Sequence, residues 1–236
     1  MRARTKALLP LIAIAAAVFL SCGDDEEATP TPAPLTSEKV SFHTEDGITI
    51  RGHLFGDGDV AVILCHMRPS DQTSWYPFAE ELADAGYAAL TFDFRGYGES
   101  DGEQELSLVD LDVEAALRAM RERGHDTVYL VGASMGGTAS LMVAAREEVA
   151  GVVAISAPAQ FEGLNAEEVI AEVGEPKLFI AAEGDASATT SLETLFELAP
   201  EPKEQRVFGG SAHGTALLEE EHAAEVKAAI TSFLSR

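Results

Sequence analysis

The sequence predicts an α/β fold built on a mostly parallel eight-stranded sheet with helices on both faces. Short apolar runs alternate with amphipathic helical patterns from residue 39 to residue 236. Some runs, such as VAVILC at 60–65, are apolar throughout, as expected of strands covered on both faces. A glycine-flanked serine, in GASMG at 132–136, separates one such run from a helical pattern.

The first two predicted strands, at 39–44 and 48–55, are joined by a turn at Glu45-Asp46-Gly47. The chain then repeats strand and helix, which favours parallel pairing. We expect further strands at 59–66, 87–94, 127–132, 150–158, 176–185 and 203–210. We expect helices at 75–86, 105–124, 134–145, 165–174, 190–200 and 217–235. In sheets of this kind, functional groups gather at the carboxyl ends of the strands.

The composition fits one acidic globular domain. The chain has 236 residues, 46% of them apolar, which is enough for an α/β domain with a core of its own. The formal net charge of -24 argues against nucleic acid as a partner, because nucleic-acid binding needs a basic surface. It is typical of a highly soluble surface.

Residues 1–21 are typical of a signal peptide, with basic residues followed by an apolar run at 7–20. The segment FLSCGDD resembles a bacterial lipoprotein lipobox, although Phe19 and Leu20 depart from its commonest residues. The resemblance implies that Cys22 becomes the lipidated first residue after cleavage. The protein is then expected to be exported and anchored to the cell envelope, with its domain outside the cytoplasm. A plain secretory signal peptide and a retained membrane helix are the alternatives.

Residues 22–38 contain GDDEEATPTPAPLTSE, which is acidic and then rich in Pro and Thr. Such a segment has little to bury, so we expect a disordered tether between the anchor and a domain at 39–236. The chain has two cysteines. If Cys22 carries lipid, then Cys65 has no partner, and its place in an apolar run predicts a buried thiol.

Gly132-Ala133-Ser134-Met135-Gly136 matches the G-x-S-x-G pattern of a nucleophile elbow, a sharp strand-to-helix turn that exposes a serine. Side chains two residues either side of Ser134 would collide in so tight a turn, and glycine removes the clashing Cβ atoms. The helix that begins here directs N–H groups, including that of Met135, at the site. An ordinary structural turn is the alternative.

A serine hydroxyl needs a base to become a strong nucleophile. His213 follows the last predicted strand in FGGSAHG and lies at the same edge as Ser134, so it is our candidate base. The other five histidines lie on the leading strands, before a strand, at the end of the third strand, or in an acidic helix: His43, His53, His125, His66 and His222.

The base in turn needs an acid that orients it and stabilises its cation. Asp185 ends the run LFIAAEGD at the same edge and is our candidate. Glu183 lies two residues earlier, and strand alternation would place it on the same side, so it stays open as a rival. Alternatively, Asp185 serves only to cap or turn the chain.

The order Ser134, Asp185, His213 and the pattern of strands resemble the α/β-hydrolase fold over nearly all of residues 39–236. FDFRGYGESDG at 92–102 resembles the family's loop after the fourth strand, with Asp93 and Arg95 in structural roles. The branch that it resembles most is that of small serine esterases and dienelactone-hydrolase-like proteins. Dienelactone hydrolases proper have cysteine at the elbow, so their substrate is not carried over. Residues 159–175 are too few for a large cap, which predicts a minimal cap and an open site.

The resemblance also implies a second oxyanion donor in the loop after the third strand. The residue after the histidine supplies it, and here that residue is Met67, whose backbone N–H would act together with that of Met135. His66 is then a structural loop histidine. Arg68 is expected to face solvent, with contact to an anionic substrate as the alternative. Trp75 either covers the edge of the site or packs in the core.

These residues predict a serine hydrolase that cleaves small carboxylic esters through an acyl-enzyme on Ser134. Acyl transfer, and thioester or amide cleavage, use the same groups and stay open. A non-catalytic surface-binding lipoprotein that retains the fold is the alternative outside enzymes. We expect no cofactor and no metal, because the sequence shows no Cys/His cluster with ligand spacing. The oligomeric state is left open.

Overall fold

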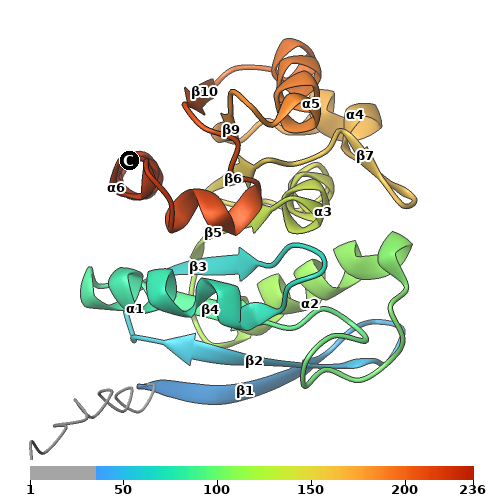
Figure 1. The fold of residues 1–236 in the computed structure, drawn as a ribbon. Coiled ribbons are helices and arrows are strands. Elements are labelled where there is room, and N and C mark those ends of the chain that lie inside the picture. The colour runs from blue at the N-terminus through green and yellow to red at the C-terminus, as the bar shows by residue number, and fades with distance from the viewer. Residues whose placement is uncertain (1–35) are drawn as a thin grey trace, which may run out of the picture. The chain divides into compact units, whose positions relative to one another are not determined.

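An eight-stranded sheet crosses the protein in the order β1-β2-β4-β3-β5-β6-β9-β10 (Figure 1). The computed structural model describes residues 36–236. The predicted signal peptide, Cys22 and nearly all of the predicted tether lie outside the described residues. The strands are β1 Ser37–His43, β2 Thr49–Phe55, β3 Val60–Cys65, β4 Ala88–Phe92, β5 Thr127–Ala133, β6 Gly151–Ile155, β9 Lys177–Ala182 and β10 Lys203–Phe208.

The sheet is mostly parallel, which confirms the prediction. β1 and β2 form an antiparallel pair, and β2 is antiparallel to β4. All the other neighbours in this sheet are parallel, from β4 across to β10. The carboxyl ends of β3, β5, β6, β9 and β10 therefore meet at one edge, where the loops that follow them carry the candidate site.

Helices cover both faces of the sheet. They are α1 Tyr76–Asp84, α2 Val109–Glu122, α3 Met135–Ala144, α4 Ala166–Val169, α5 Ala186–Leu198 and α6 Ala223–Leu234. Four short 3₁₀ turns accompany them among the described residues: η1 Gln72–Trp75, η2 Leu106–Leu108, η3 Ile170–Glu172 and η4 Gly214–Leu218. α1 and α6 pack on one face, and α2 to α5 pack on the other.

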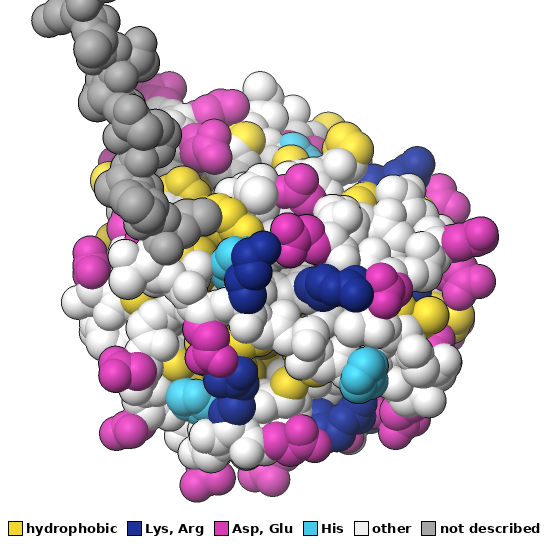
Figure 2. Space-filling model, turned by 90° about the horizontal axis from the view of Figure 1, so that it is seen from below, with side chains coloured by type: hydrophobic (Ala, Val, Ile, Leu, Met, Phe, Trp, Pro, Cys, Tyr) yellow, Lys and Arg dark blue, Asp and Glu magenta, His cyan; other side chains and the backbone are white. Residues whose placement is uncertain are grey.

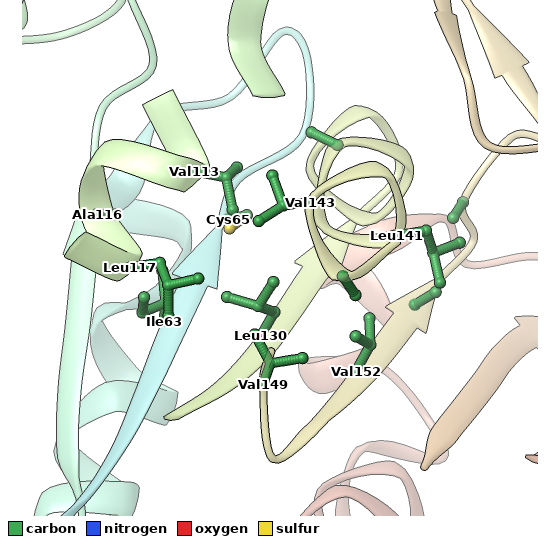
Figure 3. Close-up of a cluster of buried hydrophobic side chains, with 14 of the residues drawn as sticks. Ile63, Cys65, Val113, Ala116, Leu117, Leu130, Leu141, Val143, Val149 and Val152 are labelled. Atoms are coloured by element: carbon green, nitrogen blue, oxygen red, sulfur yellow. The ribbon is translucent and has the colours of Figure 1, made fainter. Parts of the chain in front are cut away.

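Strand β3 contributes side chains to the hydrophobic clusters on both faces of the sheet. Its residues alternate between the two hydrophobic clusters: Ile63 and Cys65 face α2 and α3, while Val62 and Leu64 face α1 and α6. Figure 3 shows Ile63 of β3 beside Leu117 of α2 in the first of these layers. A strand buried on both faces needs apolar side chains at every position, which explains the uninterrupted run VAVILC.

Element boundaries differ from the prediction at several places. β1 begins at Ser37 and pairs it with Phe55, so the domain takes in the last residues of the predicted tether. α5 begins at Ala186 because Asp185 caps its first turn. The last helix begins at Ala223 rather than at 217, and the residues before it form η4 and a turn. A two-stranded hairpin, β7 Gln160–Phe161 with β8 Leu164–Asn165, was not predicted.

Asp93 and Arg95 sit in buried networks behind the site. The Arg95 guanidinium bonds to Asp112 at 2.7 Å and to Asp46 at 2.7 Å. The carboxylate of Asp93 accepts hydrogen bonds from the N–H groups of Gln72 and Glu99, at 3.0 and 2.9 Å. A buried charge is tolerated only when it is paired and hydrogen-bonded, so both residues anchor the loop after β4.

Acidic side chains are scattered over the face that Figure 2 shows, with basic ones among them. This distribution agrees with the formal net charge of -24. In residues 36–236, no helix has both the length and the apolar character that crossing a membrane requires.

Candidate active site

Ser134 occupies a strained corner between β5 and α3. Its φ of 48° and ψ of −118° lie in a backbone region that residues other than glycine rarely adopt. Its N–H donates to the carbonyl of Ile155 on the neighbouring strand at 2.8 Å, which helps hold the corner. Strain at a single polar residue between a strand and a helix is the geometry of a nucleophile elbow.

The glycines around Ser134 provide the clearance that this corner needs. A Cβ on Gly132 would lie 2.3 Å from the carbonyl oxygen of Gly136. A Cβ on Gly136 would lie 2.3 Å from the carbonyl oxygen of Cys65 on β3. Both distances are far below van der Waals contact, and the atoms met are backbone, which has little room to move. Glycine at both positions therefore removes the backbone clashes that the sequence pattern predicts for this turn.

Asp185 and His213 are in direct contact at the same edge of the sheet. His213 Nδ1 donates to Asp185 Oδ2 at 2.5 Å. The other carboxylate oxygen of Asp185 accepts from the Ala188 N–H at 3.3 Å and from the Ser187 hydroxyl at 3.1 Å. The Asp185 side chain is 9% exposed and that of His213 is 42% exposed. The aspartate thus orients the imidazole, with Nδ1 toward the carboxylate and Nε2 as the ring nitrogen that Asp185 does not contact.

Glu183, the rival acid, makes no hydrogen bond or salt bridge to His213, whose side-chain partner is Asp185. Its backbone N–H donates to the Phe208 carbonyl at 2.8 Å, and its side chain is exposed. Alternation along the strand does not continue past Ala182, where β9 ends, because Asp185 already belongs to the cap of α5. The structure therefore pairs His213 with Asp185.

The other histidines lie elsewhere. His53 bonds to the Ser37 hydroxyl, His125 to the Asp59 carbonyl, and His222 stacks near Phe208. His66 is fully buried: Nδ1 donates to the Met67 carbonyl at 2.9 Å, and Nε2 accepts from the Phe94 N–H at 3.0 Å. Burial lowers the pKa of His66, which keeps the ring neutral as these bonds require. It joins the loops after β3 and β4.

Met135 directly follows Ser134, whereas Met67 lies in the loop after β3. Met135 is the first residue of α3, where a backbone N–H has no acceptor within the helix. Met67 follows His66 in the loop after β3, and its sulfur accepts from the Thr215 hydroxyl at 3.8 Å. Thr215 lies two residues after His213, so the loops after β3 and β10 are in contact.

A cavity of about 310 Å³ contains the candidate nucleophile and base. Arg68, Ser134, Ser156, Pro158, Phe161, Ser187, Ala188, Ser191 and His213 line it. Within residues 36–236 no hydrogen bond joins Ser134 to His213, and such bonds commonly tighten when substrate binds. Phe161 belongs to the unpredicted hairpin and is the residue that the segment 159–175 contributes to the lining.

Ser156 is a residue of the site that the sequence analysis missed. It lies directly after β6, is 1% exposed, and has a φ of 50°. Its hydroxyl accepts a hydrogen bond from the Gly214 N–H at 3.0 Å, next to His213. Its position at the carboxyl end of a strand, in AISAP, was the signal that could have found it.

Cys65 and Trp75 belong to the core. Trp75 is fully buried and packs near Phe78, which settles the choice left open by the sequence. Cys65 is buried as predicted, and burial raises the pKa of its thiol to about 12. A thiol held in its protonated form is a poor nucleophile. Among residues 36–236, no three His, Cys, Asp or Glu side chains gather as metal ligands would.

Comparison with known proteins places this geometry in a family. Residues 60–179, about half of the chain, match the family model for the alpha/beta hydrolase fold. YfhR of Escherichia coli, an uncharacterized protein, is 26% identical over 204 residues, which cover 73% of this chain and 72% of YfhR. Esterase Pf2001 of Pyrococcus furiosus superposes with a TM-score of 0.76 at 20% identity, covering 88% of this chain and 95% of the esterase. Esterase EaEST of Exiguobacterium antarcticum gives 0.71 at 14%, covering 84% and 100%.

Proposed function

The chain belongs to the α/β-hydrolase fold family, and we propose that it is a serine hydrolase that cleaves small carboxylic esters. The observation that carries the proposal is the meeting of three groups at one edge of the sheet. Ser134 stands on a strained elbow, and the His213 ring is held by Asp185 at 2.5 Å. The esterases with this fold support the same class of reaction, although fold alone does not establish activity.

The first half of the reaction acylates Ser134. His213 Nε2 takes the hydroxyl proton as Ser134 Oγ attacks the ester carbonyl, and Asp185 stabilises the imidazolium that forms. The backbone N–H groups of Met67 and Met135 are proposed to bind the resulting oxyanion. The tetrahedral intermediate collapses, the imidazolium returns its proton to the leaving alkoxide, and an alcohol departs.

The second half hydrolyses the acyl-enzyme. A water molecule attacks the acyl carbonyl while His213 accepts one of its protons, and a second tetrahedral intermediate forms in the same oxyanion site. Its collapse releases a carboxylic acid and returns the proton to Ser134 Oγ. An acyl acceptor other than water would make the protein an acyltransferase, and a thioester or amide would replace the ester without a change of residues.

The size of the cavity favours small acyl groups. Its volume of about 310 Å³ is at the lower end of the range for ligand sites. The segment between β6 and β9 supplies only the hairpin β7–β8 and the two short helical turns α4 and η3 that follow it. A substrate therefore enters without displacing a large cap, which favours short or exposed esters over long acyl chains.

Hydrolysis of 4-nitrophenyl acetate and 4-nitrophenyl butyrate by the full-length protein tests the proposal. Wild type should hydrolyse one or both, and Ser134→Ala and His213→Ala should each lose at least about 10³-fold in kcat. His125→Ala is the matched control, because this histidine lies in the loop before β5, away from the cavity. Turnover that survives Ser134→Ala would contradict the mechanism.

We also propose that lipid on Cys22 attaches the protein to a membrane of the cell envelope, on the strength of the sequence alone. The expected result is incorporation of labelled palmitate in wild type and none in Cys22→Ala. The variant should also leave the membrane fraction. Unchanged labelling and fractionation of Cys22→Ala would overturn this part of the proposal.

A further inference from the structure

Arg68 has no ionic partner among residues 36–236, although the protein is rich in acids. Of the sixteen lysines and arginines in the chain, three precede residue 36, which leaves thirteen in the described residues. Twelve of these bond to a carboxylate or to a backbone carbonyl. Arg68 alone has no such partner within residues 36–236, although the chain holds 40 Asp and Glu residues.

Arg68 lies at the candidate site, where its charge can meet a bound molecule. It lines the same cavity as Ser134 and His213, in the loop directly after Met67. No Asp or Glu is among the described residues that line this cavity. An arginine that served only for solubility could stand anywhere on the surface. This one stands where a bound molecule would meet it, and no carboxylate of the lining neutralises it.

The other polar groups of the lining are hydroxyls. Ser187 and Ser191 come from the first turns of α5, and Ser156 comes from the end of β6. The Ser187 hydroxyl donates its proton to Asp185, whereas those of Ser156 and Ser191 can donate hydrogen bonds to anions as well as to neutral oxygens. A guanidinium binds a carboxylate with two parallel N–H···O bonds, which a neutral group of the same shape does not match.

We infer that Arg68 makes this site selective for esters whose acyl chain ends in a carboxylate. The inference rests on the proposed function, because the acyl chain is placed by its attachment to Ser134. The net charge of -24 repels anions at long range, so the selectivity arises from this local contact and not from steering. The hydrolysis products would be an alcohol and a dicarboxylic acid.

The test compares three charged esters with three neutral ones. The charged esters are the mono-4-nitrophenyl esters of glutaric, adipic and pimelic acid, so that the length of the acyl chain need not be known in advance. Each is paired with the uncharged branched alkanoate ester of the same shape, and the enzyme-free rate is subtracted. The measured quantity is the ratio of kcat/KM for the charged ester to that for its neutral partner.

For at least one chain length, Arg68→Gln should lower this ratio about tenfold, the size expected of a charge-assisted contact at an exposed site. Arg68→Glu should lower it further, and Arg68→Lys should retain part of it. Added salt should reduce the wild-type ratio, because exposed charges are screened. Arg118→Gln is the matched control: Arg118 bonds to the His43 carbonyl, does not line the cavity, and should leave the ratio unchanged.

The possible failures are distinguishable. If wild type hydrolyses both classes of ester, Ser134→Ala hydrolyses neither, and Arg68→Gln keeps the wild-type ratio at every chain length, the inference about Arg68 is wrong while the proposed function stands. If wild type hydrolyses neither class, the proposed function fails and the inference fails with it. Circular dichroism of each variant shows that a changed ratio comes from a folded protein.

Discussion

The hydroxyl of Ser156 accepts a hydrogen bond of 3.0 Å from the backbone N–H of Gly214, the residue after His213. This contact links the end of β6 to the loop after β10. Gly214 itself has a φ of 60°, and a Cβ there would lie 2.4 Å from the Met67 sulfur. The loop that carries the candidate base is therefore held from two sides, and we expect Ser156 to help position His213.

Ser156→Ala should impair catalysis through the position of His213. The change removes the acceptor and leaves the Gly214 N–H without a partner, which costs about 1–3 kcal/mol in the free energy of unfolding. We expect kcat for 4-nitrophenyl butyrate to fall at least about tenfold with KM little changed, since misplacing a catalytic group affects the reacting geometry more than binding. Steady-state kinetics and urea unfolding measure the two effects. Wild-type kcat in the variant would show that Ser156 does not position His213.

Asp185→Asn should reduce kcat by about 10³- to 10⁴-fold, because an amide does not hold the imidazole in the required tautomer or stabilise its cation. The matched control is Glu183→Gln. This residue is two positions earlier, and its exposed side chain makes no hydrogen bond or salt bridge to His213, so ester hydrolysis should stay at the wild-type rate. The opposite pattern, with Glu183→Gln inactive and Asp185→Asn active, would reverse the assignment of the acid.

Gly132→Ala should destabilise the protein and abolish hydrolysis. Its new methyl group would lie 2.3 Å from the Gly136 carbonyl oxygen, and relieving such overpacking costs about 1–3 kcal/mol. Gly174→Ala is the matched control, because nothing lies within 4 Å of a Cβ at that glycine. We expect the control to change stability by no more than about 0.5 kcal/mol. Equal urea midpoints for the two variants would show that the elbow tolerates a side chain.

His66 should make stability depend on pH. Burial lowers its pKa from 6.5, while its hydrogen bond to the Met67 carbonyl raises it to a smaller extent. Below pH 6.5 the unfolded chain takes up a proton that the folded protein does not, so the free energy of unfolding falls with falling pH. The fall is at most about 1.4 kcal/mol per pH unit for this one group.

Urea unfolding of wild type and His66→Gln at about pH 7.5 and about pH 5.5 measures this contribution. Burial also lowers the pKa of His53, which titrates in the same direction in both proteins and cancels in the comparison. Wild type should lose more stability than His66→Gln between the two conditions. The same loss in both proteins would mean that His66 takes up a proton in the folded state.

The sequence was most informative where one physical requirement acted on consecutive residues. The run at 60–65 had to be apolar throughout because β3 contacts helices on both faces, and this made the parallel sheet predictable. The hairpin β7–β8 was missed because each of its strands has two residues, too few for any periodicity. The start of the last helix was misplaced because helical spacing in LLEEEHAAE continues upstream of Ala223, where the chain forms η4 and a turn instead.

Some residues of the candidate site could likewise be predicted from a local sequence pattern, and others depend on tertiary structure. Ser134 and its glycines were predictable because steric clearance leaves a local pattern, and Asp185 and His213 because each follows a strand at the same edge. The choice between Asp185 and Glu183 depended on where β9 ends and α5 begins, which tertiary packing decides. For Arg68, which follows Met67 in the loop after β3, the sequence left contact with an anionic substrate open, and Ser156 has no motif around it. Their place in the site follows from the paths of loops that are distant in sequence.

The most direct test of the central claim is mass-spectrometric mapping of the full-length protein after reaction with a fluorophosphonate. This reagent phosphonylates a serine that an adjacent base has activated, whatever the natural substrate. We predict one adduct, on Ser134 in the peptide that contains GASMGG, slower labelling of His213→Ala, and none in Ser134→Ala. An unlabelled wild type, or a label on another residue that persists in Ser134→Ala, would contradict the assignment of Ser134 as the nucleophile.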